Sequence, residues 1–324
     1  MVKFHTFIVA ASLSVCGVAV GDVDGRALCH RCDRILAQHS VCDGERAWAV
    51  VLKDGKPLAF GQYGCKDGHP TACEFTFEPG SVIKPFVAAT ALEKKVIQSL
   101  DAEYRTDVIE EGYGMIPEDR CHNWPVKMSV RDGLAKSSNV VFGKLGYDVG
   151  PHRLCDGLRR FGFGGDAGFL EDPNRWTDVM RSRAGVGQSM LVTPMQLAKA
   201  YAILANGGVG FDVKSNRVVS SEVATSVCSS LESVGASLND TDIEGGAHKS
   251  GVRVAGMTGT AQRVVDGHYV KGLYNASYVG FFKWKDSQYV IAVVFECGRR
   301  DRHRGREVSM PVFNEIADVI TGGK

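Results

Sequence analysis

The sequence predicts an α/β fold of the α+β kind, in which helices lie between strands that come from both ends of the chain. Residues 47–51 and 58–61 flank Asp54-Gly55, and an Asp-Gly pair between two apolar runs is typical of a β-hairpin. Three strand-like segments lie near the other end: residues 252–257, 277–284 and 289–296. Helical signals occupy the interval between. We therefore expect one sheet that both ends of the chain complete.

Composition places the chain among globular proteins. It has 324 residues, of which 44% are hydrophobic, and a formal net charge of +1. Such a chain can bury a large core, and it lacks the excess of basic residues that nucleic-acid binding requires. The sequence contains no repeat, low-complexity tract or linker that would divide residues 45–324, which we expect to form one domain.

The first residues read as an export signal. Lys3 precedes an apolar run over residues 7–20, which ends at Gly21-Asp22. The run is shorter than the roughly 18 to 20 residues of a spanning helix, so a cleaved signal over residues 1–21 is favoured over a membrane anchor. A lipoprotein site at Cys16 is a further alternative, although Val15 is bulky for that motif. Each reading places the protein in the periplasm or on the outer face of the cytoplasmic membrane.

Ten cysteines are many for a chain of this length, and half of them lie between residues 29 and 73. In an exported protein, disulfides among Cys29, Cys32, Cys42, Cys65 and Cys73 are the first expectation, with a connectivity that the sequence leaves open. A redox pair or half a zinc site at Cys29-His30-Arg31-Cys32 is the alternative. No second Cys or His pair completes a zinc site, so we predict neither a metal nor a cofactor.

The first motif that carries chemistry is Ser81-Val82-Ile83-Lys84. Pro79-Gly80 ends any preceding element, and Pro85 fits a helix only near its start, so Ser81 should lie at a helix N-terminus. At positions i and i+3 the hydroxyl of Ser81 and the amine of Lys84 share one helix face. A neutral Lys84 could then take the hydroxyl proton, which makes Ser81 a candidate nucleophile.

A second motif, Lys136-Ser137-Ser138-Asn139, separates two runs with helical apolar spacing, residues 130–134 and 140–145. Its plainest reading is a short polar loop with capping residues between two helices. Further along, Thr193-Pro194-Met195-Gln196 is a capping box with proline at N1, and the helix that it starts should end at Asn206-Gly207-Gly208.

A third motif, Met257-Thr258-Gly259-Thr260, begins at the last residue of the strand-like segment 252–257. An S-x-x-K, an S-x-N and a K-T-G in this order mark the serine acyl-transfer site of penicillin-binding proteins and serine β-lactamases. Residues 128–140 and 185–208 resemble class B penicillin-binding proteins, as does Pro311-Val312-Phe313, which would open the last helix. The resemblance covers roughly residues 45 to 320. It implies a five-stranded antiparallel sheet flanked by helices, with an inserted helical subdomain.

The resemblance also implies roles for the motif residues. Ser81 would attack the carbonyl between the two terminal D-alanines of a peptidoglycan stem peptide, and Lys84 would take its proton. Ser137 and Asn139 would relay protons and hold the peptide. Backbone N–H groups of Ser81 and Thr260 would form the oxyanion hole. Penicillin and other β-lactams would be covalent inhibitors that mimic the donor peptide.

Met257 departs from the family pattern, because relatives carry a cation there that orients the terminal carboxylate of the substrate. A methionine fills a similar volume but donates no hydrogen bond. Thr258, Gly259 and Thr260 are retained, so we expect this strand still to bind substrate. Arg253 and Arg263 are too far along the strand for a simple replacement.

Three functions follow from this pattern. The first is a D,D-transpeptidase or D,D-carboxypeptidase impaired by Met257; the alternatives are a non-turnover penicillin-binding sensor or pseudoenzyme, and a serine β-lactamase. Glu171-Asp172-Pro173-Asn174 resembles a transpeptidase turn more than the deacylating loop of a β-lactamase. Residues 22–44 are too few for the large pedestal of class B relatives, so contacts with other cell-wall synthesis proteins are not predicted.

Overall fold

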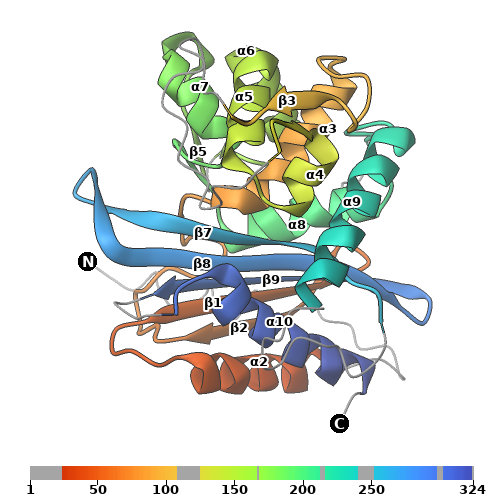
Figure 1. Cartoon of the computed structure of the whole chain (residues 1–324). Coiled ribbons are helices and arrows are strands. Elements are labelled where there is room, and N and C mark those ends of the chain that lie inside the picture. The colour runs from red at the N-terminus through yellow and green to blue at the C-terminus, as the bar shows by residue number, and fades with distance from the viewer. Residues whose placement is uncertain are drawn as a thin grey trace.

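The computed structural model describes residues 24–107, 125–165, 168–211, 216–239, 252–297 and 302–322. Its centre is a five-stranded antiparallel sheet in the order β2-β1-β9-β8-β7 (Figure 1). The strands are β1 (Arg46–Lys53), β2 (Lys56–Tyr63), β7 (Ala255–Val265), β8 (His268–Trp284) and β9 (Ser287–Cys297). Strands from the two ends of the chain therefore share one sheet, which confirms the predicted fold class.

Turn chemistry explains the hairpin between β1 and β2. Asp54 and Gly55 both have positive φ, 48° and 72°, which is the requirement of a type I′ turn and the reason that an Asp-Gly pair occurs there. The strand predicted over residues 252–257 is displaced in the structure, because β7 begins at Ala255 and continues to Val265. The whole third motif consequently lies inside an edge strand.

One face of the sheet is covered by the helical part of the molecule (Figure 1). The helices are η1 (Gly80–Ile83), α3 (Lys84–Glu93), α4 (Val130–Ala135), α5 (Asn139–Val149), α6 (Pro151–Arg160), η4 (Pro173–Arg175), α7 (Asp178–Gly185), α8 (Pro194–Ala205) and α9 (Ser221–Asn239). This part also contains two short antiparallel strand pairs: β3 (Glu103–Arg105) with β4 (Lys127–Ser129), and β5 (Phe169–Leu170) with β6 (Met190–Leu191). The capping box at Thr193 and Gln196 starts α8, as predicted.

The other face carries α2 (Gly25–His39) and α10 (Gly305–Thr321). Sequence reasoning missed α2, whose Leu28, Cys32 and Leu36 are buried. The prediction that Pro311 opens the last helix is wrong. Its N-cap is Arg304, whose backbone N–H donates to the Glu307 carboxylate, so α10 begins at Gly305 and Pro311 lies inside it.

The structure describes only part of the N-terminal region, from residue 24 onwards. The proposed signal, residues 1–21, lies outside the described residues, as does Cys121. None of the described helices combines the length and the apolar character needed to cross a membrane. No disulfide joins any two cysteines of the described ranges, and Cys32 is buried with its pKa raised to about 12, mainly by burial.

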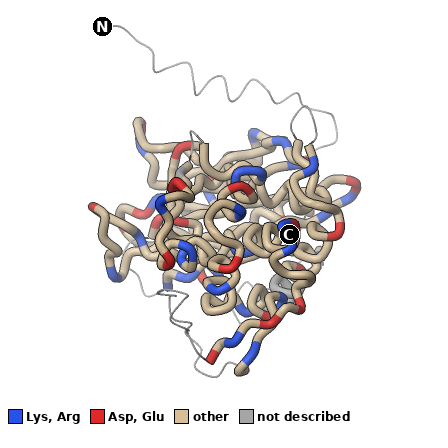
Figure 2. The backbone as a smooth tube through the Cα atoms, turned by 90° about the horizontal axis from the view of Figure 1, so that it is seen from above, with Lys and Arg blue, Asp and Glu red and all other residues tan. Residues whose placement is uncertain are grey.

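Charge is mixed over the molecule. Figure 2 shows basic and acidic residues interspersed along the described part of the backbone, without a stripe of one sign. This distribution agrees with the formal charge of +1.

Candidate active site

Ser81 lies where the sequence predicts it, in the short helix η1 that leads directly into α3. Gly80, just before it, has a φ of 57°, and its N–H donates to the carbonyl of Gly187 at 3.0 Å. A side chain at Gly187 would collide with Gly80, since its Cβ would lie 2.1 Å from the Gly80 oxygen. Two glycines thus let the loop after α7 fix the chain immediately before the nucleophile.

Lys84 joins the first two motifs. Its side chain is fully buried, and its Nζ donates to the Ser137 carbonyl at 2.6 Å, to the Asn139 Oδ1 at 2.9 Å and to the Ser137 Oγ at 3.2 Å. The ring of Phe142 lies 5.6 Å from this nitrogen. The buried amine of Lys84 therefore brings together three of the residues predicted as catalytic, Lys84, Ser137 and Asn139, and Ser81 precedes it by three residues in the same helical segment.

The loop of the second motif is strained where it meets Lys84. Ser137 has a φ of 58°, a left-handed conformation that L-residues other than glycine seldom adopt. Ser138 is the N-cap of α5 and accepts the N–H of Val141 at 3.2 Å. The cap fixes the start of α5 and with it Asn139, while the unusual φ lets both oxygens of Ser137 reach one ammonium group. Strain of this kind clusters at functional sites.

The third motif alternates across β7. Met257 and Gly259 face η1, and a Cβ on Gly259 would lie 2.8 Å from the Pro79 oxygen, so only glycine lets the strand approach so closely. The Oγ1 of Thr260, on the opposite side, accepts the backbone N–H of Gly305 at 3.1 Å. Substrate-binding roles for Met257, Thr258, Gly259 and Thr260 remain predictions.

Met257 is buried in this arrangement. It is 1% exposed and belongs to the apolar core between the sheet and the helices. Arg263 does not replace the missing cation, because its guanidinium pairs with Glu296 at 2.5 Å. Arg253 is exposed. A lysine at position 257 would consequently have to place its ammonium at the border of this core.

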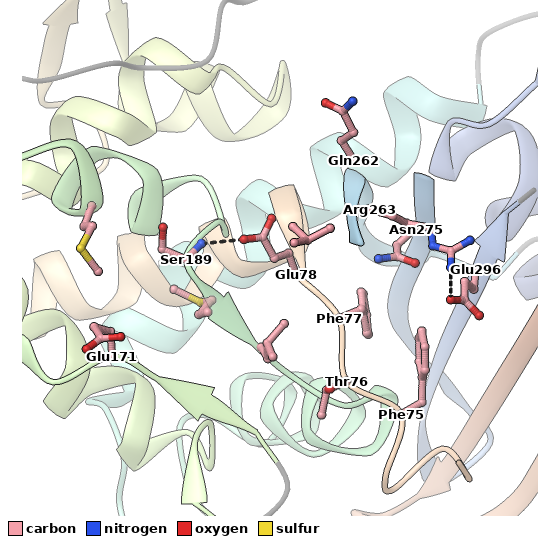
Figure 3. A pocket seen from close by; sticks show the side chains of 14 residues that line it. Phe75, Thr76, Phe77, Glu78, Glu171, Ser189, Gln262, Arg263, Asn275 and Glu296 are labelled. Carbon is pink, nitrogen blue, oxygen red and sulfur yellow. Dashed lines mark hydrogen bonds and ion pairs between the residues drawn. The ribbon is translucent and has the colours of Figure 1, made fainter. Parts of the chain in front are cut away.

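A groove of about 470 Å³ lies beside the site, along the second half of β7 (Figure 3). Glu78 lines it, three residues before Ser81, and is 9% exposed. Its carboxylate accepts the Ser189 N–H at 2.9 Å and the Tyr269 hydroxyl at 3.0 Å, while burial raises its pKa. The sequence analysis assigned no role to Glu78. The signal that could have indicated one is an acidic residue that directly follows Phe77 and precedes Ser81 by three positions. Tyr269 offered none.

Over the described ranges, no group of three or more His, Cys, Asp or Glu side chains is placed to hold a metal ion. The chemistry available at this site is that of a hydroxyl, a buried amine and backbone N–H groups, which suits acyl transfer.

Comparison with known proteins agrees with this geometry. Residues 53–318 match the family model of the penicillin binding protein transpeptidase domain. The chain is 29% identical over 303 residues to the probable peptidoglycan D,D-transpeptidase PenA of Neisseria flavescens, which covers 84% of this chain and 74% of that protein. It is 30% identical to the peptidoglycan D,D-transpeptidase FtsI of Escherichia coli, over 74% of this chain and 43% of that protein. The chain thus spans less than half of some of its curated relatives.

Solved structures show the same fold. Penicillin-binding protein 3 of Mycobacterium tuberculosis, complexed with aztreonam, has a TM-score of 0.75 at 23% identity, covering 91% of this chain and 77% of that one. The transpeptidase domain of penicillin-binding protein 3 from Burkholderia pseudomallei has a TM-score of 0.72 at 23% identity, covering 93% of this chain and 96% of that one.

Proposed function

Because the chain belongs to the family of penicillin-binding protein transpeptidase domains, we propose that it is a serine D,D-transpeptidase or D,D-carboxypeptidase that acts on peptidoglycan stem peptides. The observation that carries this proposal is the buried amine of Lys84, which contacts both oxygens of Ser137 and the Asn139 side chain one turn after Ser81. This is a proton-transfer network next to a hydroxyl nucleophile.

In the proposed reaction, the neutral amine of Lys84 removes the Ser81 proton as Oγ attacks the penultimate D-alanine carbonyl. Backbone N–H groups of Ser81 and Thr260 stabilise the oxyanion, a contribution that is typically about 3 kcal/mol per donor. Lys84, through the Ser137 hydroxyl, returns a proton to the departing D-alanine amine as the amide bond breaks. An amine of a neighbouring stem peptide, or water, then attacks the acyl-enzyme and releases Ser81.

Burial favours the neutral form of Lys84 that this step needs, because desolvation disfavours an ammonium. Three acceptors around Nζ favour the charged form instead. Approach of a substrate would exclude water from the cleft and tip this balance towards proton transfer.

Met257 supports a second candidate, a penicillin-binding protein that is acylated but turns over poorly. The side chain of Met257 has no donor for a hydrogen bond to the terminal carboxylate. Under either candidate we expect an exported protein that acts at the cell wall, as a cleaved or an anchored form, and that β-lactams inhibit covalently.

The test is intact-mass spectrometry after incubation with a penicillin. Wild type should gain the mass of one intact penicillin, because ring opening adds all of its atoms to the serine, and Ser81→Ala should gain none. Thr177→Ala, which removes the hydroxyl that caps α7, is the control and should react like wild type. Slow release of the adduct indicates a penicillin-binding protein, and rapid release indicates a β-lactamase. An adduct that persists in Ser81→Ala, or none in wild type, would refute the assignment.

A further inference from the structure

A second cavity, of about 740 Å³, lies beside the β1–β2 turn and shares no lining residue with the groove along β7. It is lined by residues 55–57 of this turn, residues 160–162 at the end of α6, Lys199 and Ile203 of α8, and residues 210–211 and 216–218 of the segment between α8 and α9. Its volume falls in the range of small-molecule sites. None of the three sequence motifs contributes a lining residue, so this hollow is separate from the candidate active site.

The charges that line this cavity are of one sign. They belong to Lys56, Arg160, Lys199 and Arg217, and none of the described lining residues is acidic. The whole chain has 38 basic and 37 acidic residues, so four cations without an anion depart from its average composition. Cations that converge on a hollow from separate elements create a positive potential inside it, which favours an anionic ligand.

Carboxylates near this cavity have other partners. Within the described part of the chain, none of the four cations forms an ion pair. Asp156, one turn before Arg160, pairs instead with Lys94 at 2.6 Å. Hydrogen bonds at the start of α9 lower the pKa of Glu222, and Arg217 adds a smaller effect from beyond ion-pair distance. The positive charge is therefore available to a ligand.

Backbone carbonyls hold the two arginines in place. The Nη1 of Arg217 donates to the carbonyls of Gly207 and Val219 at 3.0 and 3.3 Å. The Nη2 of Arg160 donates to the Arg217 carbonyl at 3.1 Å. Uncharged acceptors orient a guanidinium without cancelling its charge, and these contacts use only one nitrogen of each group. The remaining N–H donors form a fixed fork of the kind that binds phosphate oxygens.

An exposed aromatic ring lies next to these cations. Phe211 is 41% exposed, and its ring covers the turn so closely that a Cβ on Gly55 would lie 2.3 Å from it. Gly55 thus lets the ring pack against the β1–β2 hairpin. An aromatic ring that is supported in this way and stays accessible at a cavity provides a surface on which a ring of a ligand can stack.

We propose that this cavity is a second ligand site, which binds a soluble diphosphate ester with a ring close to its phosphates. Arg160, Lys199 and Arg217 would donate to the phosphate oxygens, and Phe211 would stack on the ring. A ligand with one negative charge would leave most of these donors unused. Because the cations surround a hollow, a small ligand fits them better than the flat surface of a membrane does. No residue of the candidate active site takes part, so the inference is independent of the proposed function.

Isothermal titration calorimetry of the whole protein tests the proposal with three probes: pyrophosphate, uridine diphosphate and uridine. Pyrophosphate supplies the charge alone, uridine supplies the ring alone, and uridine diphosphate supplies both. We expect uridine diphosphate to bind about 10-fold more tightly than pyrophosphate, because a base stacks favourably on an aromatic side chain. Uridine should not bind measurably.

Lys199→Gln tests the charge. Lys199 is exposed and makes no hydrogen bond or ion pair within the described chain, so its loss should not disturb the fold. The change should weaken binding of both phosphate probes by about 10-fold, the size of one charge-assisted hydrogen bond. Arg153→Gln removes an equal charge from the exposed face of α6, outside the cavity, and should leave both affinities unchanged.

Phe211→Ala tests the ring. It should lower the affinity for uridine diphosphate to about that for pyrophosphate, and it should leave the affinity for pyrophosphate itself as in wild type. An unchanged preference for uridine diphosphate in Phe211→Ala would remove the ring from the proposed ligand and overturn its assigned class.

Prior treatment with penicillin locates the bound probe. Uridine diphosphate should bind the treated protein with the same affinity, since its site shares no residue with the cleft at Ser81. Displacement by penicillin would place the probe in that cleft and overturn the inference. A protein that penicillin does not acylate would refute the proposed function and leave the calorimetric test of this cavity decisive.

Two further results would overturn the inference: failure of uridine diphosphate to bind at about 1 mM, or equal affinities in Lys199→Gln and Arg153→Gln. Vesicles that contain phosphatidylglycerol distinguish a membrane from a soluble ester. Vesicle binding that depends on Lys199, in a protein that does not bind uridine diphosphate, would show that these cations contact a membrane surface and would equally overturn it.

Discussion

The two faces of the central sheet bury different kinds of group. The helical side of the sheet, under η1 and α3, encloses lysine side chains, since Lys84 and Lys144 are both almost fully buried there. The face under α2 and α10 buries Ser309 and Thr321, whose hydroxyls donate to backbone carbonyls at 2.9 Å, amid an apolar core. Both faces bury an apolar core, which stabilises the fold, but the first also buries the amine of Lys84 at a cost in stability, so we expect that face to carry the chemistry.

This contrast predicts that substitutions on the two faces separate activity from stability. The largest effect should come from Lys84→Met, which removes the base and keeps the length of the side chain. We expect penicillin acylation to fall by about 1,000-fold, within the range of a lost general base. The free energy of unfolding should change by less than about 2 kcal/mol, because removal of a buried polar group offsets the lost hydrogen bonds.

Acylation rates by mass spectrometry and urea denaturation measure the two quantities for Lys84→Met. Lys94→Met, at the other end of α3, is the control; Lys94 forms a partly exposed ion pair with Asp156 and should be dispensable for acylation. Acylation of Lys84→Met at the wild-type rate would remove Lys84 from the mechanism.

The opposite face is tested by Phe313→Ala. Phe313 is fully buried, and its ring lies 4.8 Å from that of Tyr278 on β8. Truncation should lower the free energy of unfolding by about 3 to 5 kcal/mol through lost burial and a cavity. Acylation per folded molecule should stay within about threefold of wild type, as measured at a temperature well below the melting point. A folded Phe313→Ala protein without acylation would show that the two faces are not independent.

Met257 belongs both to the third motif of the candidate site and to the apolar core on the same face of the sheet. Met257→Lys should accelerate acylation by about 10-fold if a charge-assisted hydrogen bond to the substrate carboxylate is restored. The same change should lower the free energy of unfolding by about 1 to 3 kcal/mol, since the ammonium enters a site that is 1% exposed.

Met257→Leu is the matched control, because it conserves volume without adding charge and should change neither quantity by much. An unchanged acylation rate in a well-folded Met257→Lys protein would show that acylation at this site is not limited by the lack of a cation at position 257.

The sequence predicted the parts of the molecule that local rules determine. The turn at Asp54-Gly55, the start of η1 before Ser81 and the capping box at Thr193 each follow from neighbouring residues, and the structure has all three. Helix α2 was not predicted, because Cys29 and Cys32 were interpreted as disulfide or metal-binding residues. The helical spacing of its buried residues Leu28, Cys32 and Ile35 was the signal for a helix. The predicted start of the last helix was wrong because proline usually marks the first turn of a helix, whereas Pro311 lies inside α10.

Within the site, motif spacing predicted that Ser81 and Lys84 share one helical segment, whereas neither the hydrogen bonds from Lys84 to Ser137 and Asn139 nor the groove could be predicted from local pattern. The parts of the groove come from β6, β7, β8, β9, α7 and the chain before η1 and η4, and only the sheet register brings Asn275 and Glu296 next to each other. The bond between Tyr269 and Glu78 joins residues that are 191 positions apart. Such long-range pairs leave no local pattern in a single sequence.

The smallest effect concerns the strained backbone at Ser137. Its φ of 58° is easier for glycine, so Ser137→Gly should relieve strain of about 1 to 2 kcal/mol while adding about 0.5 to 1 kcal/mol of chain entropy to the unfolded state. The net gain in the free energy of unfolding should be about 0.5 to 1 kcal/mol. Acylation should slow by about 10-fold, because Lys84 loses the Ser137 hydroxyl.

Lys95→Gly separates the two consequences of this change, since Lys95 is exposed after α3 and has a φ of 57°. It should give a similar gain in stability with an unchanged acylation rate. Ser137→Ala, which removes the hydroxyl and keeps the strain, should slow acylation without the gain. If Ser137→Gly were instead less stable than wild type, the hydrogen bonds from Lys84 would outweigh the strain, and this face of the sheet would be stabilised by its catalytic groups.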